Sequence, residues 1–316
     1  MTKRRLGRSE LMIEPLVLGT NVFGWTADEP TSFAIMDAFL GEGFNAIDTA
    51  DSYSRWVPGN DSDSEKIIGR WMKARGNRDK VLVFTKVGSD MGQGHKDLSG
   101  KWIEQEVEAS LIRLQTDYID LYQSHWPDER TPQEETLRAH DRLIKAGKVR
   151  YIGTSNHDEK LLTEALEISK REGLARYETI QNEFNLYSRA KFEGPAQDIC
   201  VREEISGIHY AGLAQGFLSG KYRSEADASK SAGRGKGVVS KYLNEKGFRI
   251  LAALDAVAGR TGAQPAEIAL AWVAAQPAVA APIASATSVE QLASLVRSAR
   301  LQLSQQDLRD LTEAGR

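Results

Sequence analysis

The chain alternates short hydrophobic runs with longer stretches in which hydrophobic residues recur every three to four positions. The short runs are mostly continuous rather than alternating apolar and polar, which is typical of parallel strands covered on both faces. We expect eight strands, at residues 15–19, 44–48, 81–86, 118–124, 149–154, 178–181, 207–211 and 279–284. Helices are predicted between them, at residues 31–41, 64–75, 101–114, 132–146, 159–172, 195–204, 265–275 and 288–300.

Residues at the ends of these stretches support the predicted helices. Ser62 begins one helix and Ser288 another, and serine is a favoured N-cap. With Gln291 three positions later, Ser288 also matches a capping box. Glycines stand just past three predicted helices, at positions 43, 147 and 173, where glycine commonly ends a helix.

The repeated pattern favours one (β/α)8 TIM barrel spanning residues 1–316 over two doubly wound domains, because eight units follow one another without a change in composition. Residues 6–14 are expected to form an N-terminal β-hairpin that covers the closed end of the barrel. Residues 304–315 are expected to form an extra C-terminal helix with Ser304 as its N-cap. Residues 221–260 read as a long insertion, and its Gly/Ser-rich part, 229–240, is predicted to be a mobile loop on the C-terminal face.

The composition excludes several classes of protein. The 316 residues include 41 Lys+Arg and 44 Asp+Glu, so the net charge of −3 gives no reason to expect binding to nucleic acid or to an anionic membrane. A single cysteine rules out an internal disulfide and a Cys-rich zinc site. The N-terminus lacks the apolar run of a signal peptide, and the longest apolar stretch is interrupted by polar residues and prolines. We therefore expect a cytoplasmic protein with no membrane span.

The common cofactor and metal motifs are absent. The GRGKG run at 233–237 follows no predicted strand and lacks the third glycine of a dinucleotide-binding loop. The sequence contains no Walker A motif and no HExxH, and we predict no metal site. A dinucleotide would have to bind through another architecture.

Four polar residues follow consecutive predicted strands. Asp48 and Tyr53 follow the second, Lys86 ends the third and His125 ends the fourth. The catalytic residues of TIM barrels lie at these strand ends. Taken alone, Asp48 could cap a helix, Tyr53 could lie on a surface loop and His125 could be a core histidine. Lys86 is harder to explain structurally, because burying an unpaired ammonium costs several kcal/mol.

Together with further motifs in the same order, these residues resemble the aldo-keto reductase superfamily over nearly the whole chain. The most specific piece is NAIDTADSY at 45–53, followed by SEKIIG at 64–69. Lys86 and DLYQSHWP at 120–127 match the family's third-strand lysine and fourth-strand histidine motif. Further matches are PLVLGT at 15–20, GKVRYIGTSN at 147–156, QNEFNL at 181–186 and YAGLAQGFLSGKY at 210–222.

The resemblance implies hydride transfer between a nicotinamide ring and a carbonyl or alcohol substrate, such as an aldehyde, ketone or sugar. Tyr53 would be the general acid/base, and its ordinary pKa near 10 is too high for ready proton donation. We expect Lys86 to lower that pKa and Asp48 to hold the lysine in place. His125 would hydrogen-bond the substrate oxygen.

The resemblance also implies a dinucleotide site. Ser155, Asn156 and Gln181 would bind the nicotinamide carboxamide, and Tyr210 would stack on the ring. The residues expected along the pyrophosphate are Leu213, Gln215, Ser219 and Lys221. Other residues assigned to the dinucleotide are Thr20, Ile283, Ser285, Thr287 and Gln291. Trp25, Trp56 and Trp126 follow strands one, two and four, and either line a substrate pocket or serve ordinary packing.

The sequence departs from the family pattern at the dinucleotide site. Ala211 and Gly212 stand where the family has Ser-Pro, and Leu295 replaces an expected asparagine. The segment IASATSVEQL at 283–292 has no Lys or Arg to pair a 2′-phosphate. The family favours NADP(H), and NAD(H) stays possible.

Two other functions stay open at this point. A lysine at the end of a barrel strand could form a Schiff base, as in an aldolase of the same fold class. Some members of the superfamily are subunits of membrane channels, so a cofactor-binding redox sensor is the second alternative. The physiological substrate, the reaction direction and the oligomeric state are not readable from the sequence.

Overall fold

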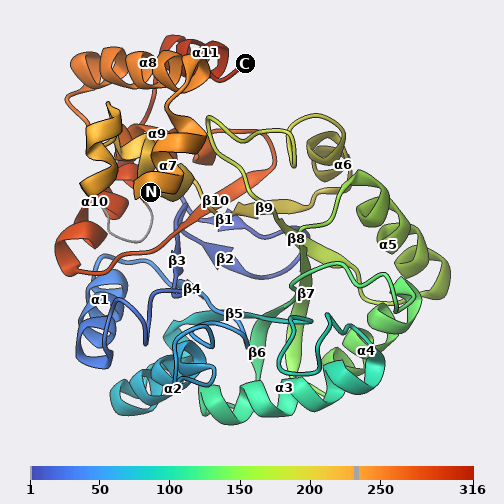
Figure 1. Ribbon diagram of the computed structural model, residues 1–316. Coiled ribbons are helices and arrows are strands. Elements are labelled where there is room, and N and C mark those ends of the chain that lie inside the picture. Colours follow the sequence, from blue (N-terminus) through green and yellow to red (C-terminus); the bar gives the residue numbers. More distant parts are fainter. Residues whose placement is uncertain (1, 231–234) are drawn as a thin grey trace.

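Eight parallel strands close into a barrel in the computed structural model, which describes residues 2–230 and 235–316 (Figure 1). The barrel strands are β3 (Val17–Gly19), β4 (Ala46–Asp48), β5 (Leu82–Val87), β6 (Ile119–Ser124), β7 (Val149–Ser155), β8 (Tyr177–Gln181), β9 (Ser206–His209) and β10 (Val279–Ala284). Their order around the barrel follows the chain, and β10 pairs with β3 to close it. The predicted (β/α)8 TIM barrel is confirmed, and each predicted strand overlaps an observed one.

The predicted helices are also present, and they form a ring outside the strands (Figure 1). They are α1 (Glu29–Gly41), α2 (Asp63–Arg75), α3 (Gly100–Leu114), α4 (Gln133–Lys145), α5 (Glu159–Glu172), α6 (Pro195–Glu203), α9 (Pro265–Ala274) and α10 (Val289–Arg300). The Ser288 hydroxyl caps α10 by accepting from the backbone N–H of Gln291. Ser62 makes no side-chain cap bond and has a φ of 57°, so the expected cap on α2 is wrong.

The N-terminal hairpin closes one end of the barrel, as predicted. Its strands, β1 (Arg4–Arg5) and β2 (Met12–Ile13), pair antiparallel and appear inside the ring of strands in Figure 1. Leu6, Leu11 and Ile13 are fully or almost fully buried and belong to the hydrophobic cluster that fills the barrel. The hairpin therefore supplies part of the barrel's core.

Arg4 fastens this hairpin to the last strand. Its Nη1 donates to the carbonyl oxygens of Ala274, Val279 and Ala280 at 2.7, 3.1 and 3.0 Å. These carbonyls lie at the end of α9 and at the start of β10, roughly 270 residues further along the chain. The hairpin is thus joined to α9 and β10 at the closed end of the barrel.

The insertion is where the structure differs most from the expectation. Residues 221–260 contain α7 (Gly235–Tyr242) and the long helix α8 (Glu245–Thr261), so the prediction of a loop is wrong there. The apolar residues Ile250, Leu254 and Val257 of α8 are buried at three- and four-residue spacing. Residues 231–234, within the predicted mobile loop, lie outside the described residues. The insertion also contains the short 3-10 helix η3 (Glu225–Lys230). Two further 3-10 helices lie outside the insertion, η1 (Arg78–Lys80) and η2 (Ala214–Ser219).

The extra C-terminal helix α11 (Gln305–Ala314) is present and lies beside α8 at the edge of the molecule (Figure 1). Ser304 and Asp307 form a reciprocal capping box at its start. Arg260 of α8 forms ion pairs with Asp307 and Asp310 at 2.7 and 2.8 Å. No helix in the described ranges is long and apolar enough to cross a membrane.

Alternation along the strands separates the barrel interior into an apolar and a polar half. Near the hairpin the buried side chains include Val17, Phe84 and Leu121. Two residues further along β5, the same face carries Lys86, because successive side chains of a strand point to opposite sides. This register places the polar residues together at the open end of the barrel.

Candidate active site

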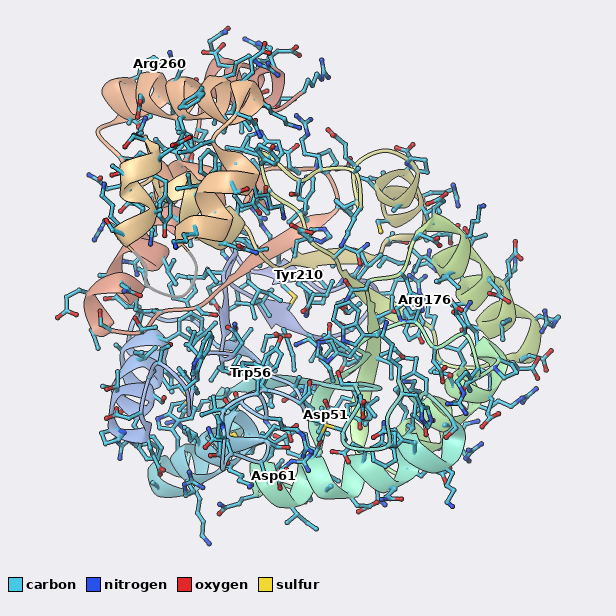
Figure 2. All side chains as sticks on the ribbon, viewed as in Figure 1. Asp51, Trp56, Asp61, Arg176, Tyr210 and Arg260 are labelled. Carbon is cyan, nitrogen blue, oxygen red and sulfur yellow. The ribbon has the colours of Figure 1, made fainter. Side chains whose placement is uncertain are left out.

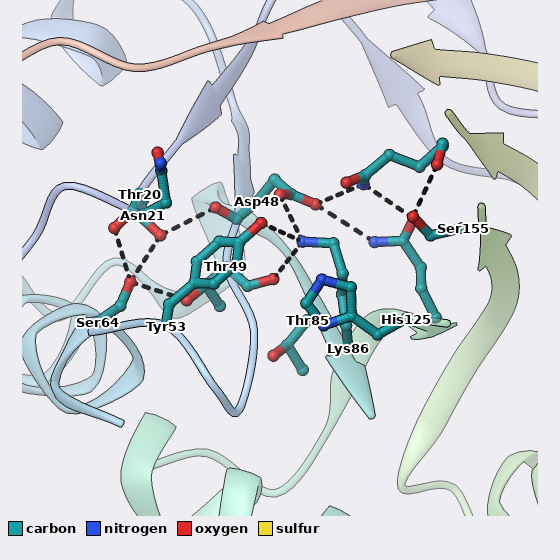
Figure 3. Close-up of polar contacts among 12 residues, drawn as sticks. Thr20, Asn21, Asp48, Thr49, Tyr53, Ser64, Thr85, Lys86, His125 and Ser155 are labelled. Carbon is teal, nitrogen blue, oxygen red and sulfur yellow. Dashed lines mark hydrogen bonds and ion pairs between the residues drawn. The ribbon is translucent and has the colours of Figure 1, made fainter. Parts of the chain in front are cut away.

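Lys86 is the centre of the polar cluster at the open end. Its ammonium is completely buried and lies 2.7 Å from Asp48 Oδ2, 2.7 Å from the carbonyl oxygen of Thr49 and 3.0 Å from the hydroxyl of Tyr53 (Figure 3). Three acceptors match the three N–H groups of an ammonium. The buried charge is therefore both paired and fully hydrogen-bonded, as the cost of burying it requires.

Asp48 is fixed from a second direction by amides. Its Oδ1 accepts from Gln181 Nε2 at 2.9 Å and from Gln123 Nε2 at 3.3 Å, while its Oδ2 accepts from Lys86. Gln181 also donates to Gln123 Oε1 at 3.2 Å. The carboxylate thus links strands β4, β5, β6 and β8 across the interior and holds the lysine in one position.

The pKa of Tyr53 differs from the expectation. Burial raises it, and the opposing effect of the Lys86 charge is smaller, so the pKa of Tyr53 lies above its ordinary value. The predicted lowering by Lys86 is present, but the cost of removing a phenolate from water outweighs it. For Lys86, burial lowers the pKa but Asp48 and Tyr53 outweigh it, so the pKa is raised and the ammonium stays charged. Tyr53 is therefore protonated at neutral pH and has a cation beside its oxygen.

His125 lies against Tyr53 on one side and Trp126 on the other. The His125 and Trp126 rings stack with centroids 5.5 Å apart and planes 17° apart, and the Tyr53 ring meets His125 edge-on at 5.9 Å. Burial, with the charges of Lys86 and Lys96, holds the pKa of His125 well below its usual range. The imidazole is therefore neutral at physiological pH.

A cavity of about 620 Å³ runs past these groups toward the start of α10. It is lined by the predicted residues Asp48, Tyr53, His125, Trp126, Ser155, Asn156, Gln181, Tyr210, Leu213, Gln215, Lys221, Ile283, Ser285, Thr287 and Gln291. These residues come from distant parts of the chain, and the strand ends bring them to one opening.

Five predicted site residues do not line this cavity. Lys86 is separated from the cavity by Tyr53, to whose hydroxyl it donates a hydrogen bond. The Thr20 hydroxyl is buried against the carbonyl oxygen of Asp48 and the hydroxyl of Ser64 (Figure 3). Ser219 donates to the carbonyl oxygen of Gly216. Trp25 and Trp56 meet edge-on at 5.8 Å and are 43% and 50% exposed.

Figure 2 shows how far apart the outer aromatic residues lie: Tyr210 sits near the middle of the barrel opening, and Trp56 lies toward α2. Trp126 is the one predicted substrate-pocket tryptophan that lines the cavity described above. The ammonium of Lys96 lies 4.9 Å from the centre of its ring. A wider substrate reaching Trp56 would have to extend out of the cavity.

Sequence reasoning missed several lining residues, namely Gly19, Asn21, Val22, Gly216 and Ala284, whereas Ala211 and Gly212 line the cavity as their place in the expected dinucleotide site implies. Asn21 follows the first barrel strand directly, and that position could have singled it out. Its Oδ1 accepts from the Ser285 hydroxyl at 2.6 Å. At Gly19 an added Cβ would lie 2.7 Å from Ser285 Oγ, so only glycine leaves that wall open. The small residues gave no chemical signal of their own.

The cavity's middle section is lined by Tyr210 and by amide and hydroxyl side chains. The Tyr210 hydroxyl donates to Asn156 Oδ1 at 2.8 Å, which fixes the ring as one wall. Asn156 Nδ2 contacts Ser155 Oγ at 3.0 Å and the carbonyl oxygen of His125 at 3.0 Å. Together with Gln181, these side chains offer both donors and acceptors to a carboxamide.

The far section contains a sharp turn of the chain with an ammonium against it. Gln215 and Gly216 have φ values of 58° and 90°, so the chain turns sharply there. An added Cβ at Gly216 would lie 3.4 Å from Lys221 Nζ, which places that ammonium directly against the turn. Arg223 is held by Asp255 through two nitrogens at 2.6 and 2.8 Å, so its charge is already paired.

The last part of the cavity carries hydroxyls and amides. Thr287 donates to Gln291 Oε1 through its backbone N–H at 3.0 Å and its hydroxyl at 3.1 Å. The backbone amides at the start of α10 lie next to this pair and favour an anion. Within the described residues, no group of three or more His, Cys, Asp or Glu side chains is arranged to hold a metal ion.

The open end of this (β/α)8 barrel thus holds a buried Asp–Lys pair, a tyrosine and a neutral histidine, and comparison with known proteins shows the family to which the chain belongs. Residues 15–316 match the model of the Aldo/keto reductase family, so the chain belongs to this family. It is 32% identical to "Protein tas" of Escherichia coli (strain K12), over 98% of this chain and 96% of that protein. It is 35% identical to "Uncharacterized oxidoreductase YrpG" of Bacillus subtilis (strain 168), over 98% and 94%. It is also 33% identical to "Probable voltage-gated potassium channel subunit beta" of Oryza sativa subsp. japonica, over 92% and 89%.

Proposed function

We propose that this protein is an NAD(P)(H)-dependent oxidoreductase that interconverts a small-molecule carbonyl and its alcohol, with Tyr53 as the acid/base. The observation that carries the proposal is the contact of a protonated, half-buried Tyr53 with the Lys86 ammonium at 3.0 Å, at the wall of a cavity of about 620 Å³. The nicotinamide supplies or accepts the hydride when it is bound. The rest of the chemistry belongs to side chains of this protein.

In the direction of reduction, the carbonyl carbon gains the hydride and the oxygen must gain a proton. Tyr53 lines the cavity and donates that proton. The phenolate that results lies beside Lys86, whose charge is kept in place by Asp48. Solvent protons then restore the phenol. In the direction of oxidation the same phenolate accepts the alcohol proton.

Ser155, Asn156 and Gln181 would hold the carboxamide of the nicotinamide, and Tyr210 would stack on its ring. The ammonium of Lys221 would pair with the pyrophosphate beside the turn at Gly216. These assignments rest on the cavity lining and on the contacts that already fix Tyr210 and Asn156.

Cofactor preference follows from the charges at the far end. Hydroxyls and backbone amides replace a cation in the segment 283–291, and Arg223 is paired with Asp255. We therefore expect a modest ratio of kcat/KM for NADPH over NADH. A preference of about a thousandfold, equivalent to about 4 kcal/mol, would mean that Lys221 or a released Arg223 binds the 2′-phosphate.

Two observations bear on the alternatives. All three N–H groups of Lys86 are engaged and its pKa is raised, whereas a Schiff-base lysine needs a neutral amine, so an aldolase is disfavoured. Borohydride trapping with a carbonyl substrate should label nothing at Lys86.

The similarity to a protein named as a probable channel subunit keeps a cofactor-binding sensor as the second candidate. Turnover at ordinary enzymatic rates would decide against it.

The deciding experiment follows nicotinamide absorbance with both cofactors against a panel of aldehydes, ketones and sugars, in both directions. We expect turnover with at least one compound. Tyr53→Phe should abolish turnover and leave cofactor binding intact, measured by fluorescence titration. Near-normal rates in Tyr53→Phe would contradict the acid/base assignment. Absence of turnover with the whole panel would contradict the function.

A further inference from the structure

Ser89, two residues after β5, contacts the proposed substrate-orienting histidine from behind the cavity. It is 7% exposed, and its Oγ lies 2.9 Å from His125 Nδ1. A second hydroxyl, that of Ser52, donates to Ser89 Oγ at 3.2 Å. Ser52 lies in the loop that also carries Tyr53, so a chain of two hydroxyls joins this loop to the imidazole.

The contacts of the Ser89 hydroxyl favour one placement of the proton on His125. Ser89 accepts from Ser52, and among the described residues His125 Nδ1 is the one remaining acceptor within reach of the Ser89 O–H, so the buried hydroxyl is fully satisfied only if it donates to Nδ1. A neutral imidazole has one N–H and one acceptor nitrogen. If Nδ1 accepts, the proton must be on Nε2.

The other ring nitrogen is the one available to a substrate. His125 lines the cavity, and among the residues with described placement no hydrogen bond is made to its Nε2. Because burial and the nearby Lys86 and Lys96 charges keep the ring neutral, its tautomer decides whether it presents a donor or an acceptor. A carbonyl oxygen can only accept, so the Nε2–H form alone gives a productive contact.

We infer that Ser89 is a positioning residue that holds His125 in the Nε2–H tautomer and so makes it a hydrogen-bond donor to the substrate oxygen. This inference rests on the proposed function for its catalytic consequence, although the tautomer itself does not. The same arrangement serves both directions, because the oxygen of the alcohol also accepts from Nε2–H while its own proton goes to Tyr53.

Three variants separate this role from simple packing. Ser89→Ala removes the donor to Nδ1, whereas Ser89→Thr keeps a hydroxyl at the same position. Ser169→Ala is the matched control, because Ser169 is also a buried serine with a hydroxyl bonded to a neighbouring group, but it lies on α5 away from the cavity. His125→Gln serves only to assign the histidine signals.

The first readout is the 15N chemical shift of the His125 ring nitrogens in protein labelled at histidine, recorded at pH 7.5. We expect the Nε2–H pattern in the wild type, Ser89→Thr and Ser169→Ala, and a mixture of both tautomers in Ser89→Ala. An Nδ1–H pattern in the wild type, or an unchanged Nε2–H pattern in Ser89→Ala, would overturn the inference.

The second readout is kcat/KM for carbonyl reduction. Loss of a partner that orients a reacting group commonly costs about 10- to 100-fold, and we expect that loss in Ser89→Ala with unchanged cofactor affinity. Ser89→Thr and Ser169→Ala should stay within about threefold of the wild type, which is less than about 0.7 kcal/mol. A Ser89→Ala enzyme with wild-type kcat/KM would overturn the catalytic role. If the wild type reduces no carbonyl, the proposed function fails, while the tautomer measurement still tests the role of Ser89.

Discussion

Strand β5 has a cluster of buried charges on each of its two sides, and the clusters differ in charge balance. Lys86 faces the interior, where its ammonium pairs with one carboxylate, that of Asp48. Thr85, the residue before it, faces outward and donates to Glu65 Oε1 at 2.5 Å. Adjacent residues of one strand thus contribute to two chemically different environments.

The outer cluster has more carboxyls than cations. Arg113 lies 2.6 Å from Glu65 and also pairs with Glu106. Asp51 is completely buried nearby, toward α3 in Figure 2, and neither of its carboxyl oxygens has a hydrogen-bond partner of normal geometry among the described residues. Burial, with the charges of Glu65 and Glu106, raises the pKa of Asp51 well above its ordinary value.

The difference shows two ways of tolerating a buried ionisable group. In the inner cluster one ammonium is paired with one carboxylate, so Lys86 stays charged and its charge lies beside the Tyr53 hydroxyl. In the outer cluster one guanidinium serves two carboxylates, and Asp51 avoids the cost of burial by staying protonated. The inner arrangement supports chemistry, and the outer one supports the packing of α2 and α3 against β5.

The largest expected effect is from Lys86→Met, which removes the only cation of the inner cluster within the described residues. The phenolate of Tyr53 loses its stabilising charge, so we expect kcat/KM to fall by about a thousandfold or more, equivalent to at least about 4 kcal/mol. Lys80→Met, at an exposed position in η1, is the control and should leave kcat/KM unchanged. A loss of less than about tenfold in Lys86→Met would show that the charge does not act on the reaction.

Arg113→Met breaks the outer cluster instead. It leaves Glu65 and Glu106 buried without their cation, and such a change typically costs about 3–5 kcal/mol of unfolding free energy. Urea denaturation followed by circular dichroism measures this. The folded variant should keep its kcat/KM within a few fold, because Arg113 lies outside the barrel interior. If kcat/KM of Arg113→Met falls as steeply as that of Lys86→Met while its unfolding free energy is unchanged, the outer cluster does not have the structural role described here.

Asp51→Asn tests the protonation of the outer cluster. A carboxyl with a raised pKa in the folded state binds its proton more tightly there than in the unfolded chain. Folded-state stability from this group is therefore present at low pH and is lost as pH rises from the unfolded value near 4 through the folded value. The amide of the variant has no proton to lose. The unfolding free energy of the variant should therefore rise relative to that of the wild type by up to about 1.4 kcal/mol for each pH unit in that window. Urea denaturation at pH 5 and 6 compares the two, and a difference that is constant with pH would mean that Asp51 is ionised.

The smallest expected effect concerns pH and His125. Because its pKa is held well below 6.5, the imidazole stays neutral from pH 6 to 8, and kcat/KM for reduction should show no inflection near 6.5. We expect less than about a twofold change from this group over that range. The pH profile of the wild type checks this, with His125→Gln as the reference. An inflection that is present in the wild type and absent from His125→Gln would show that His125 titrates there.

The sequence predicted the barrel because its strands are continuous hydrophobic runs and because eight strand–helix units follow one another without a change in composition. It also predicted the inner cluster, since Asp48, Tyr53, Lys86 and His125 each follow a strand. It did not reveal α8, although Ile250, Leu254 and Val257 have helical spacing, because the glycines and serines before them favoured a loop. The pKa of Tyr53, the buried Thr20 hydroxyl and the contact of Ser89 with His125 depend on burial and orientation, which only the folded chain defines.

The three carbonyls bound by Arg4 have a consequence for how the chain is made. Arg4 leaves the ribosome well before its partners on α9 and β10, which follow it by 270 to 276 residues. Until they emerge, β3 and β9 are open sheet edges and the inner side of the hairpin has no complete core to enter. Such edges are sites of mispairing between nascent chains. Truncation before Val279 should therefore release a product that depends on chaperones, and a product that includes β10 should lose that dependence.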